Sequence, residues 1–145
     1  MRKMKTLVVK IVAFALVLAL CIGFVGCDTI VLNSYAATMF VRSETRNGVS
    51  YSFASFNGKY RTDIHADSGR DTDICYSASL DEGEISVYFE CATSAGKTLL
   101  FTLKGGESIE DRGWYVGAGM KVRIYLETPE GVSAKGGKIK VSLGN

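Results

Sequence analysis

Asp63, His65 and Asp67 are the residues whose types and spacing could most directly support chemistry. They stand at i, i+2 and i+4, so on a strand they share one face, where they could bind a metal ion or transfer protons. The chain has no Gly-x-Ser-x-Gly nucleophile turn to accompany its single histidine, and Gly69 stands one place late for a calcium loop. We therefore expect a solvated strand face with weak metal candidates, no cofactor and no enzyme activity.

Three aromatic residues form the second candidate site. Trp114 and Tyr115 lie in the glycine-rich segment 113–119, and Tyr125 lies on the polar side of a neighbouring segment. Exposed aromatic rings on β-proteins can stack on sugars or peptide side chains, so these three are the candidate ligand-binding residues. The alternative is that Trp114 closes one end of the hydrophobic core, which is the more frequent fate of a lone tryptophan in a small domain.

A period-two alternation of apolar and polar residues must position these side chains. It predicts strands at residues 38–45, 49–56, 59–66, 72–80, 84–91, 98–103, 120–128 and 138–143, with a shorter one at 113–116. Glycine turns such as Asn47-Gly48, Asn57-Gly58 and Glu82-Gly83 separate them and indicate an antiparallel meander. About eight such strands bury their apolar faces by forming two packed sheets, so the expected fold is an all-β antiparallel sandwich. Its expected core residues are Tyr76, Ile85, Val87, Phe89, Val122, Ile124 and Leu126.

Cys75 and Cys91 are a candidate disulfide, but strand register argues against the bond. A hairpin that turns both apolar faces inward pairs Ile74 with Cys91, which leaves Cys75 pointing to the opposite side. A disulfide would need a β-bulge to bring the two sulfurs together.

The N-terminus has the composition of an export signal. Four basic residues and no acidic residue precede an uncharged apolar run, residues 11–26, which ends in Phe24-Val25-Gly26-Cys27. This ending resembles the lipobox of bacterial lipoproteins, which implies cleavage after Gly26 and acylation of Cys27 with chains such as palmitate. The expected organisation is a signal peptide at 1–26, the lipidated cysteine and a short tether at 27–36, and one sandwich domain at 37–145. The alternative is an uncleaved transmembrane anchor.

The charge of the mature chain excludes a nucleic-acid partner. The full chain has 17 basic and 15 acidic residues, and all four basic residues of the leader would be lost on cleavage, leaving a net charge of −2. No basic patch or tail remains that would bind nucleic acid or an anionic membrane surface. The expected membrane attachment is through acyl chains on Cys27, and two or more chains make such an anchor stable.

The stretch from residue 54 to 143 resembles a group of small bacterial cell-envelope lipoproteins that carry one β-sandwich after the lipidated cysteine. The resemblance rests on Gly58-Lys59-Tyr60, on two strands around Gly83, and on a closing hairpin of residues 120–127 and 137–141. It implies the fold and an extracytoplasmic, membrane-anchored location, and it implies no catalytic activity.

These observations together predict a lipoprotein on the extracytoplasmic face of the plasma membrane. We expect it to act as a non-catalytic binding module of the cell envelope whose partner is an envelope glycan or protein. The alternatives are a purely structural surface protein and a hydrolase acting on envelope material.

Overall fold

The computed structural model describes residues 34–144, which form nine β-strands. They are β1 (Ser34–Thr38), β2 (Val41–Thr45), β3 (Gly48–His65), β4 (Thr72–Ser79), β5 (Glu84–Cys91), β6 (Thr98–Lys104), β7 (Ser108–Val116), β8 (Lys121–Glu127) and β9 (Ala134–Leu143). Within these residues no helix is long and apolar enough to cross a membrane. The predicted leader, Cys27 and the first part of the tether lie outside the described residues and stay predictions.

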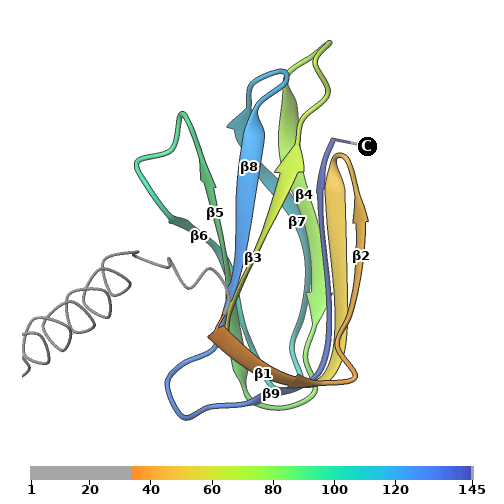
Figure 1. Ribbon diagram of the computed structural model, residues 1–145, viewed down its shortest axis with the longest axis vertical. Coiled ribbons are helices and arrows are strands. Elements are labelled where there is room, and N and C mark those ends of the chain that lie inside the picture. The colour runs from red at the N-terminus through yellow and green to blue at the C-terminus, as the bar shows by residue number, and fades with distance from the viewer. Residues whose placement is uncertain (1–33, 145) are drawn as a thin grey trace, which may run out of the picture. The chain divides into compact units, whose positions relative to one another are not determined.

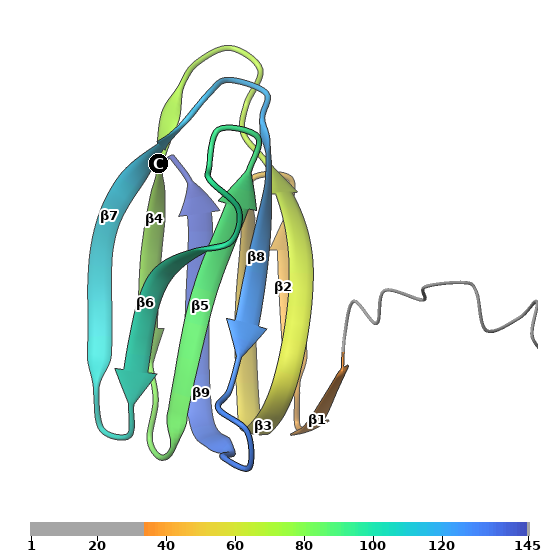
Figure 2. The same ribbon diagram turned by 90° about the vertical axis from the view of Figure 1, so that its left-hand side faces the viewer.

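The strands form an all-β sandwich of two layers, which confirms the predicted fold class. The hydrogen-bonded order is β6-β5-β8-β3-β9-β4-β7, with β1 and β2 pairing to β3 as well. The first layer contains β6, β5, β8 and the C-terminal half of β3; the second contains β2, the N-terminal half of β3, β9, β4 and β7. Figures 1 and 2 show this arrangement, with β6, β5 and β8 in front of β9 in Figure 2.

Strand β3 joins the two layers, and the predicted turn at Asn57-Gly58 is wrong. The strand continues through these residues because β1 pairs along them, with Ala36 opposite Asn57 and Tyr35 opposite Gly58. Gly58 has φ 118°, and a Cβ there would collide with the carbonyl oxygen of Ser34. Glycine is required at this bend, not to end the strand but to let it pass from one layer to the other.

The meander predicted from the sequence is also wrong. Only β2–β3 and β5–β6 pair with their immediate successors among the described strands. The expected hairpin of residues 120–127 and 137–141 does not form, because β8 lies between β3 and β5 while β9 lies between β3 and β4. Most successive strands of this protein lie in opposite layers and therefore cannot pair. The alternation of apolar and polar residues along one strand does not reveal which strand pairs with it.

Cys75 and Cys91 are both free thiols, as predicted, but the predicted reason is wrong. Ile74 does not pair with Cys91: it pairs with Gly113 and Leu143, while Cys91 pairs with Val122. Strands β4 and β5 belong to different layers, and this separation replaces the expected hairpin.

The predicted core is largely confirmed. Ile85, Val87, Phe89, Val122, Ile124 and Leu126 are at most 3% exposed, whereas Tyr76 is half-buried and stacks on Phe101 with ring centroids 5.2 Å apart. The one buried polar residue of the described chain, Thr62, accepts a hydrogen bond of 2.7 Å from the Tyr51 hydroxyl. Burial raises the pKa of Tyr51 far above its usual range, so the phenol stays neutral.

Two strand boundaries differ from the prediction. Strand β1 includes residues 34–36, which the sequence analysis gives to the tether. Met39 (φ 50°) separates β1 from β2, so the predicted strand 38–45 is divided. Strand β7 begins at Ser108 rather than near Gly113, although residues 110–112 are three successive charged residues. As β7 is at an end of the strand order, its solvated edge tolerates these charges.

Candidate functional site: a serine and lysine face

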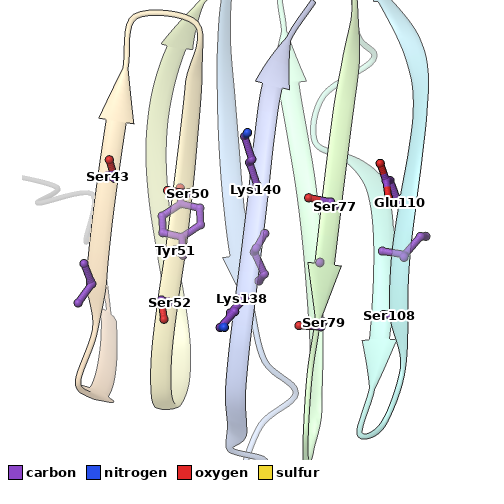
Figure 3. Close-up of a pocket in the computed structure, with 14 residues that line it drawn as sticks. Ser43, Ser50, Tyr51, Ser52, Ser77, Ser79, Ser108, Glu110, Lys138 and Lys140 are labelled. Atoms are coloured by element: carbon purple, nitrogen blue, oxygen red, sulfur yellow. The ribbon is translucent and has the colours of Figure 1, made fainter. Parts of the chain in front are cut away.

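The outer face of the second layer carries a shallow hollow of about 550 Å³ lined mainly by serines and two lysines. Strand β9 contributes Lys138 and Lys140 at its centre, and Figure 3 shows serines of β3 on one side of them and serines of β4 on the other. We call this surface the serine–lysine face. It comprises Ser43, Ser50, Ser52, Ser77, Ser79, Ser108, Lys138, Lys140 and Glu110.

Strand register places these residues in straight rows across the sheet. One row runs through Ser43, Ser50, Lys140, Ser77 and Glu110, each directly opposite the next. The next row runs through Val41, Ser52, Lys138, Ser79 and Ser108. Because side chains alternate between faces, the intervening Ile139 and Ala78 face the core and leave polar groups outward.

A third row extends the face towards the other end of the sheet. It runs through Thr45, Gly48, Ser142, Cys75 and Arg112 and borders a second hollow of about 400 Å³. The Arg112 guanidinium lies 3.6 Å from the Cys75 sulfur, and this contact raises the pKa of Arg112. The polar surface is therefore continuous over three rows.

The lysines of this face lack internal counter-charges. Within residues 34–144, neither Lys138 nor Lys140 has a carboxylate within 4.0 Å, and the hydroxyls of Ser50, Ser52, Ser77 and Ser79 bond to no other side chain. Ammonium groups and hydroxyls in this state are free to bind a polar or anionic ligand. The lining of the larger hollow includes no histidine or cysteine, so it offers binding groups rather than a nucleophile and base.

Trp114 is exposed and held in an unusual backbone conformation. It is 52% exposed with φ 59°, at the register shift where Asp73 faces Tyr115 and Ile74 faces Gly113. Its ring also leans on buried Phe89, with centroids 5.3 Å apart. The side chain thus combines a contact with the core and an open surface.

Tyr115 is 66% exposed and is bound to a loop aspartate. Its hydroxyl donates a hydrogen bond to Asp71, and the backbone N–H of Ala118 donates another to the same carboxylate at 2.9 Å. These two donors hold the pKa of Asp71 below its ordinary value. The contact orders the edge of a small hollow that neither Trp114 nor Tyr125 lines.

Tyr125 lies apart from the other two aromatic residues, on the outer face of the first layer. It pairs with Tyr88 across β8 and β5, and the Lys97 ammonium covers both rings at 5.4 and 4.7 Å from their centroids. The structure therefore does not unite Trp114, Tyr115 and Tyr125 in one site.

The weak metal candidates are dispersed in the same way. Asp63 is close to two arginines, at 3.9 Å from Arg61 and 3.8 Å from Arg123, while the exposed His65 pairs with Lys121 across the strands. Asp67 lies beyond β3, where its carbonyl accepts from the N–H of Gly119. Among the described residues no three His, Cys, Asp or Glu side chains gather as a metal site.

The serine–lysine face was missed by the sequence analysis. The sequence contains its signal, which is the repeated polar alternation Ser50-x-Ser52, Ser77-x-Ser79 and Lys138-x-Lys140. Such alternation also describes any solvated strand face, and only the strand order brings these three pairs side by side.

Comparison with known proteins gives no family assignment. No family model matches, and no curated protein matches. Among solved structures, CsCBM6-3 from Clostridium stercorarium in complex with cellobiose has a TM-score of 0.41 and 11% identity, over 81% of this chain and 90% of that one. The C-terminal CBM6 of LamC from Zobellia galactanivorans has a TM-score of 0.33, 18% identity and coverage of 75% and 90%. The CENP-C cupin domain of Drosophila melanogaster has a TM-score of 0.32, 10% identity and coverage of 75% of both chains. Scores and identities this low do not assign the chain to any of these families.

Proposed function

We propose that this protein is a lipid-anchored, non-catalytic binding module of the bacterial cell envelope that holds a polyhydroxylated ligand, an envelope glycan, on its serine–lysine face. The observation that carries this proposal is the pair of rows in which a lysine lies directly between two serines of neighbouring strands. Groups that donate and accept hydrogen bonds at regular intervals match a ligand that repeats hydroxyl groups.

The anchor in this proposal is Cys27, which would be the first residue after cleavage. Support comes from the positively charged leader, the apolar run and the small Gly26 before the cysteine. The proposed organisation keeps the leader at 1–26 and moves the start of the domain from residue 37 to residue 34, so that strand β1 is part of the folded unit. Acylation would place the protein on the extracytoplasmic face of the plasma membrane.

Acylation can be tested in a bacterial expression host supplied with a clickable fatty acid. We expect the wild-type protein to be labelled and membrane-bound, and Cys27→Ala to be unlabelled and released. If Cys27→Ala stays labelled or membrane-bound, the lipoprotein proposal is wrong and the transmembrane alternative is supported.

The binding function can be tested by capturing polysaccharides released from bacterial envelopes on the immobilised full chain. We expect retention that is lost when Ser50, Ser52, Ser77 and Ser79 are all changed to alanine. The matched control changes Ser86 and Thr102, which bond to each other at 2.8 Å in the first layer, and should retain the ligand. Loss in both variants, or in neither, would contradict the assignment of this face.

A second candidate surface is the exposed pair Trp114 and Tyr115, favoured by the open ring of Trp114 at the register shift. Aromatic stacking could hold a sugar ring there. The same assay separates the two surfaces. If the double variant Trp114→Ala/Tyr115→Ala loses retention and the serine variant keeps it, the binding site lies at this edge.

A further inference from the structure

The two lysines of the serine–lysine face have the same kind of neighbour on both sides across the sheet. Lys138 lies between Ser52 of β3 and Ser79 of β4, and Lys140 lies between Ser50 and Ser77 of the same strands. The face therefore contains two equivalent Ser–Lys–Ser units. Because they are two residues apart along β9, their backbones are separated by about 7 Å.

The chemistry of each unit favours an anion. Each lysine lies between two serines in its row, and among the described residues its ammonium group has no carboxylate within 4.0 Å. A carboxylate or phosphate bound there could accept one charge-assisted hydrogen bond from the lysine and neutral ones from the serines. Among the described residues the only carboxylate that lines the hollow is Glu110, on β7, two strands away from Lys140 in the same row. The centre of the hollow is therefore positively charged.

The same hollow offers no exposed aromatic platform. The one aromatic residue that lines it is Tyr51, which is 2% exposed and turned towards the core. A neutral sugar would therefore gain little from ring stacking here, and affinity must come from polar and ionic contacts.

We infer that the ligand of this face is a linear anionic polymer of hydroxylated units, with one anionic group bound at each Ser–Lys–Ser unit. The inference rests on the proposed binding function and names the ligand class. The anion can be the carboxylate of an acidic sugar or the phosphodiester of a polyol phosphate chain. Because two units lie close together, a chain with two or more anions should bind much more tightly than a single anionic unit.

The test is a titration of the detergent-solubilised full chain with four probes: oligogalacturonate, poly(glycerol phosphate), monomeric galacturonate and neutral dextran. We expect at least one of the two polymers with repeated anions to bind, and binding to weaken as sodium chloride rises from about 50 to about 500 mM. Dextran and the monomer should not bind measurably. Whichever anionic polymer binds identifies the source of the charge.

Variants locate the interaction. Lys138→Gln and Lys140→Gln should each weaken binding by about tenfold, and Lys140→Arg should restore most of it. The matched control is Lys121→Gln, which removes the same charge from an exposed lysine on the outer face of the first layer and should leave binding unchanged. Circular dichroism of each variant verifies the fold.

The outcomes separate this inference from the proposed function. Binding of dextran with similar affinity, or binding insensitive to salt and to both lysine variants, would overturn the anionic ligand while leaving a glycan-binding module. Failure of both anionic polymers, with envelope polysaccharide still captured through the serines, would overturn the inference alone. Failure of every probe and of capture would overturn both.

Discussion

The outer faces of the two layers have similar polarity but opposite electrostatic organisation. On the first layer several charges are paired: Asp63 lies close to Arg61 and Arg123, Arg123 reaches Glu90 at 3.4 Å, and Lys97 pairs with Glu127. Lys121, at the end of this face, has no carboxylate within 4.0 Å among residues 34–144. On the second layer Lys138 and Lys140 lie among serines and have no such partners within residues 34–144. Charges that are already paired have little to offer a ligand, whereas neighbouring unpaired ammonium groups can bind an anion, and this difference is why we propose the second layer as the binding face.

Both outer faces are expected to rest on one shared hydrophobic core. The substitutions with the largest expected loss of stability test whether the two layers unfold together. Ile124→Ala in the first layer and Ile139→Ala in the second should each lower the free energy of unfolding by about 2 to 5 kcal/mol, because both side chains are at most 2% exposed. Urea denaturation followed by circular dichroism measures this loss. Two separate transitions, with each variant shifting only one, would show that the layers are independent.

Strand β3 connects the two layers and bends at Gly58. The next largest loss of stability is expected from a substitution at this bend. Gly58→Ala should cost about 1 to 3 kcal/mol, because φ is 118° and the added Cβ meets Ser34 backbone. Gly69→Ala, with open space around it, is the matched control. Equal unfolding midpoints for the two variants would show that the bend at Gly58 is not required.

The paired and unpaired charges should respond differently to removal. Asp63→Asn should cost about 0.5 to 1 kcal/mol of stability at low salt, because its side chain is 33% exposed and solvent screens its contacts with two arginines. Lys140→Gln should change stability by less than about 0.5 kcal/mol. Thermal unfolding at low and high salt measures both, and a larger effect of Lys140→Gln would mean that this lysine has a structural partner.

The smallest effect concerns Tyr115, at the aromatic edge beside the serine–lysine face. The pKa of Asp71 is depressed first by the hydrogen bond from Tyr115 and then by that from Ala118, so Tyr115→Phe should raise it towards its ordinary value. Because the folded pKa is the lower one, the stabilising contribution of Asp71 is present above the ordinary pKa and is lost as pH falls through the folded value. Carboxyl NMR titration measures the shift, and an unchanged Asp71 pKa in the variant would refute this contact.

Several features of the fold followed from local sequence. Alternation along β5 and β8 identified the inward residues Ile85, Val87, Ile124 and Leu126, because the two-residue period of a strand is fixed by its backbone geometry. The same rule placed Tyr125 on the outward side of β8. The leader and the acylation of Cys27 stay predictions, which rest on composition rather than on folding.

Other features were decided only when strands from distant parts of the chain met. Asn57-Gly58 has the composition of a turn, yet pairing with β1 makes it the middle of a strand. Residues 110–112 lack an apolar alternation, yet they form part of β7 because they pair with β4. Strand pairing is a contact between segments remote in sequence, so a period read along one segment cannot reveal it.

The candidate site shows the same division. The sequence by itself determined that Ser50, Ser77 and Lys140 belong to strands and occupy polar positions in them. Only the tertiary structure decided that they lie in one row, because β9 inserts between β3 and β4 rather than beside β8. Side-chain alternation is set within each strand, whereas the neighbours of a strand are set by how the two layers bury their common core.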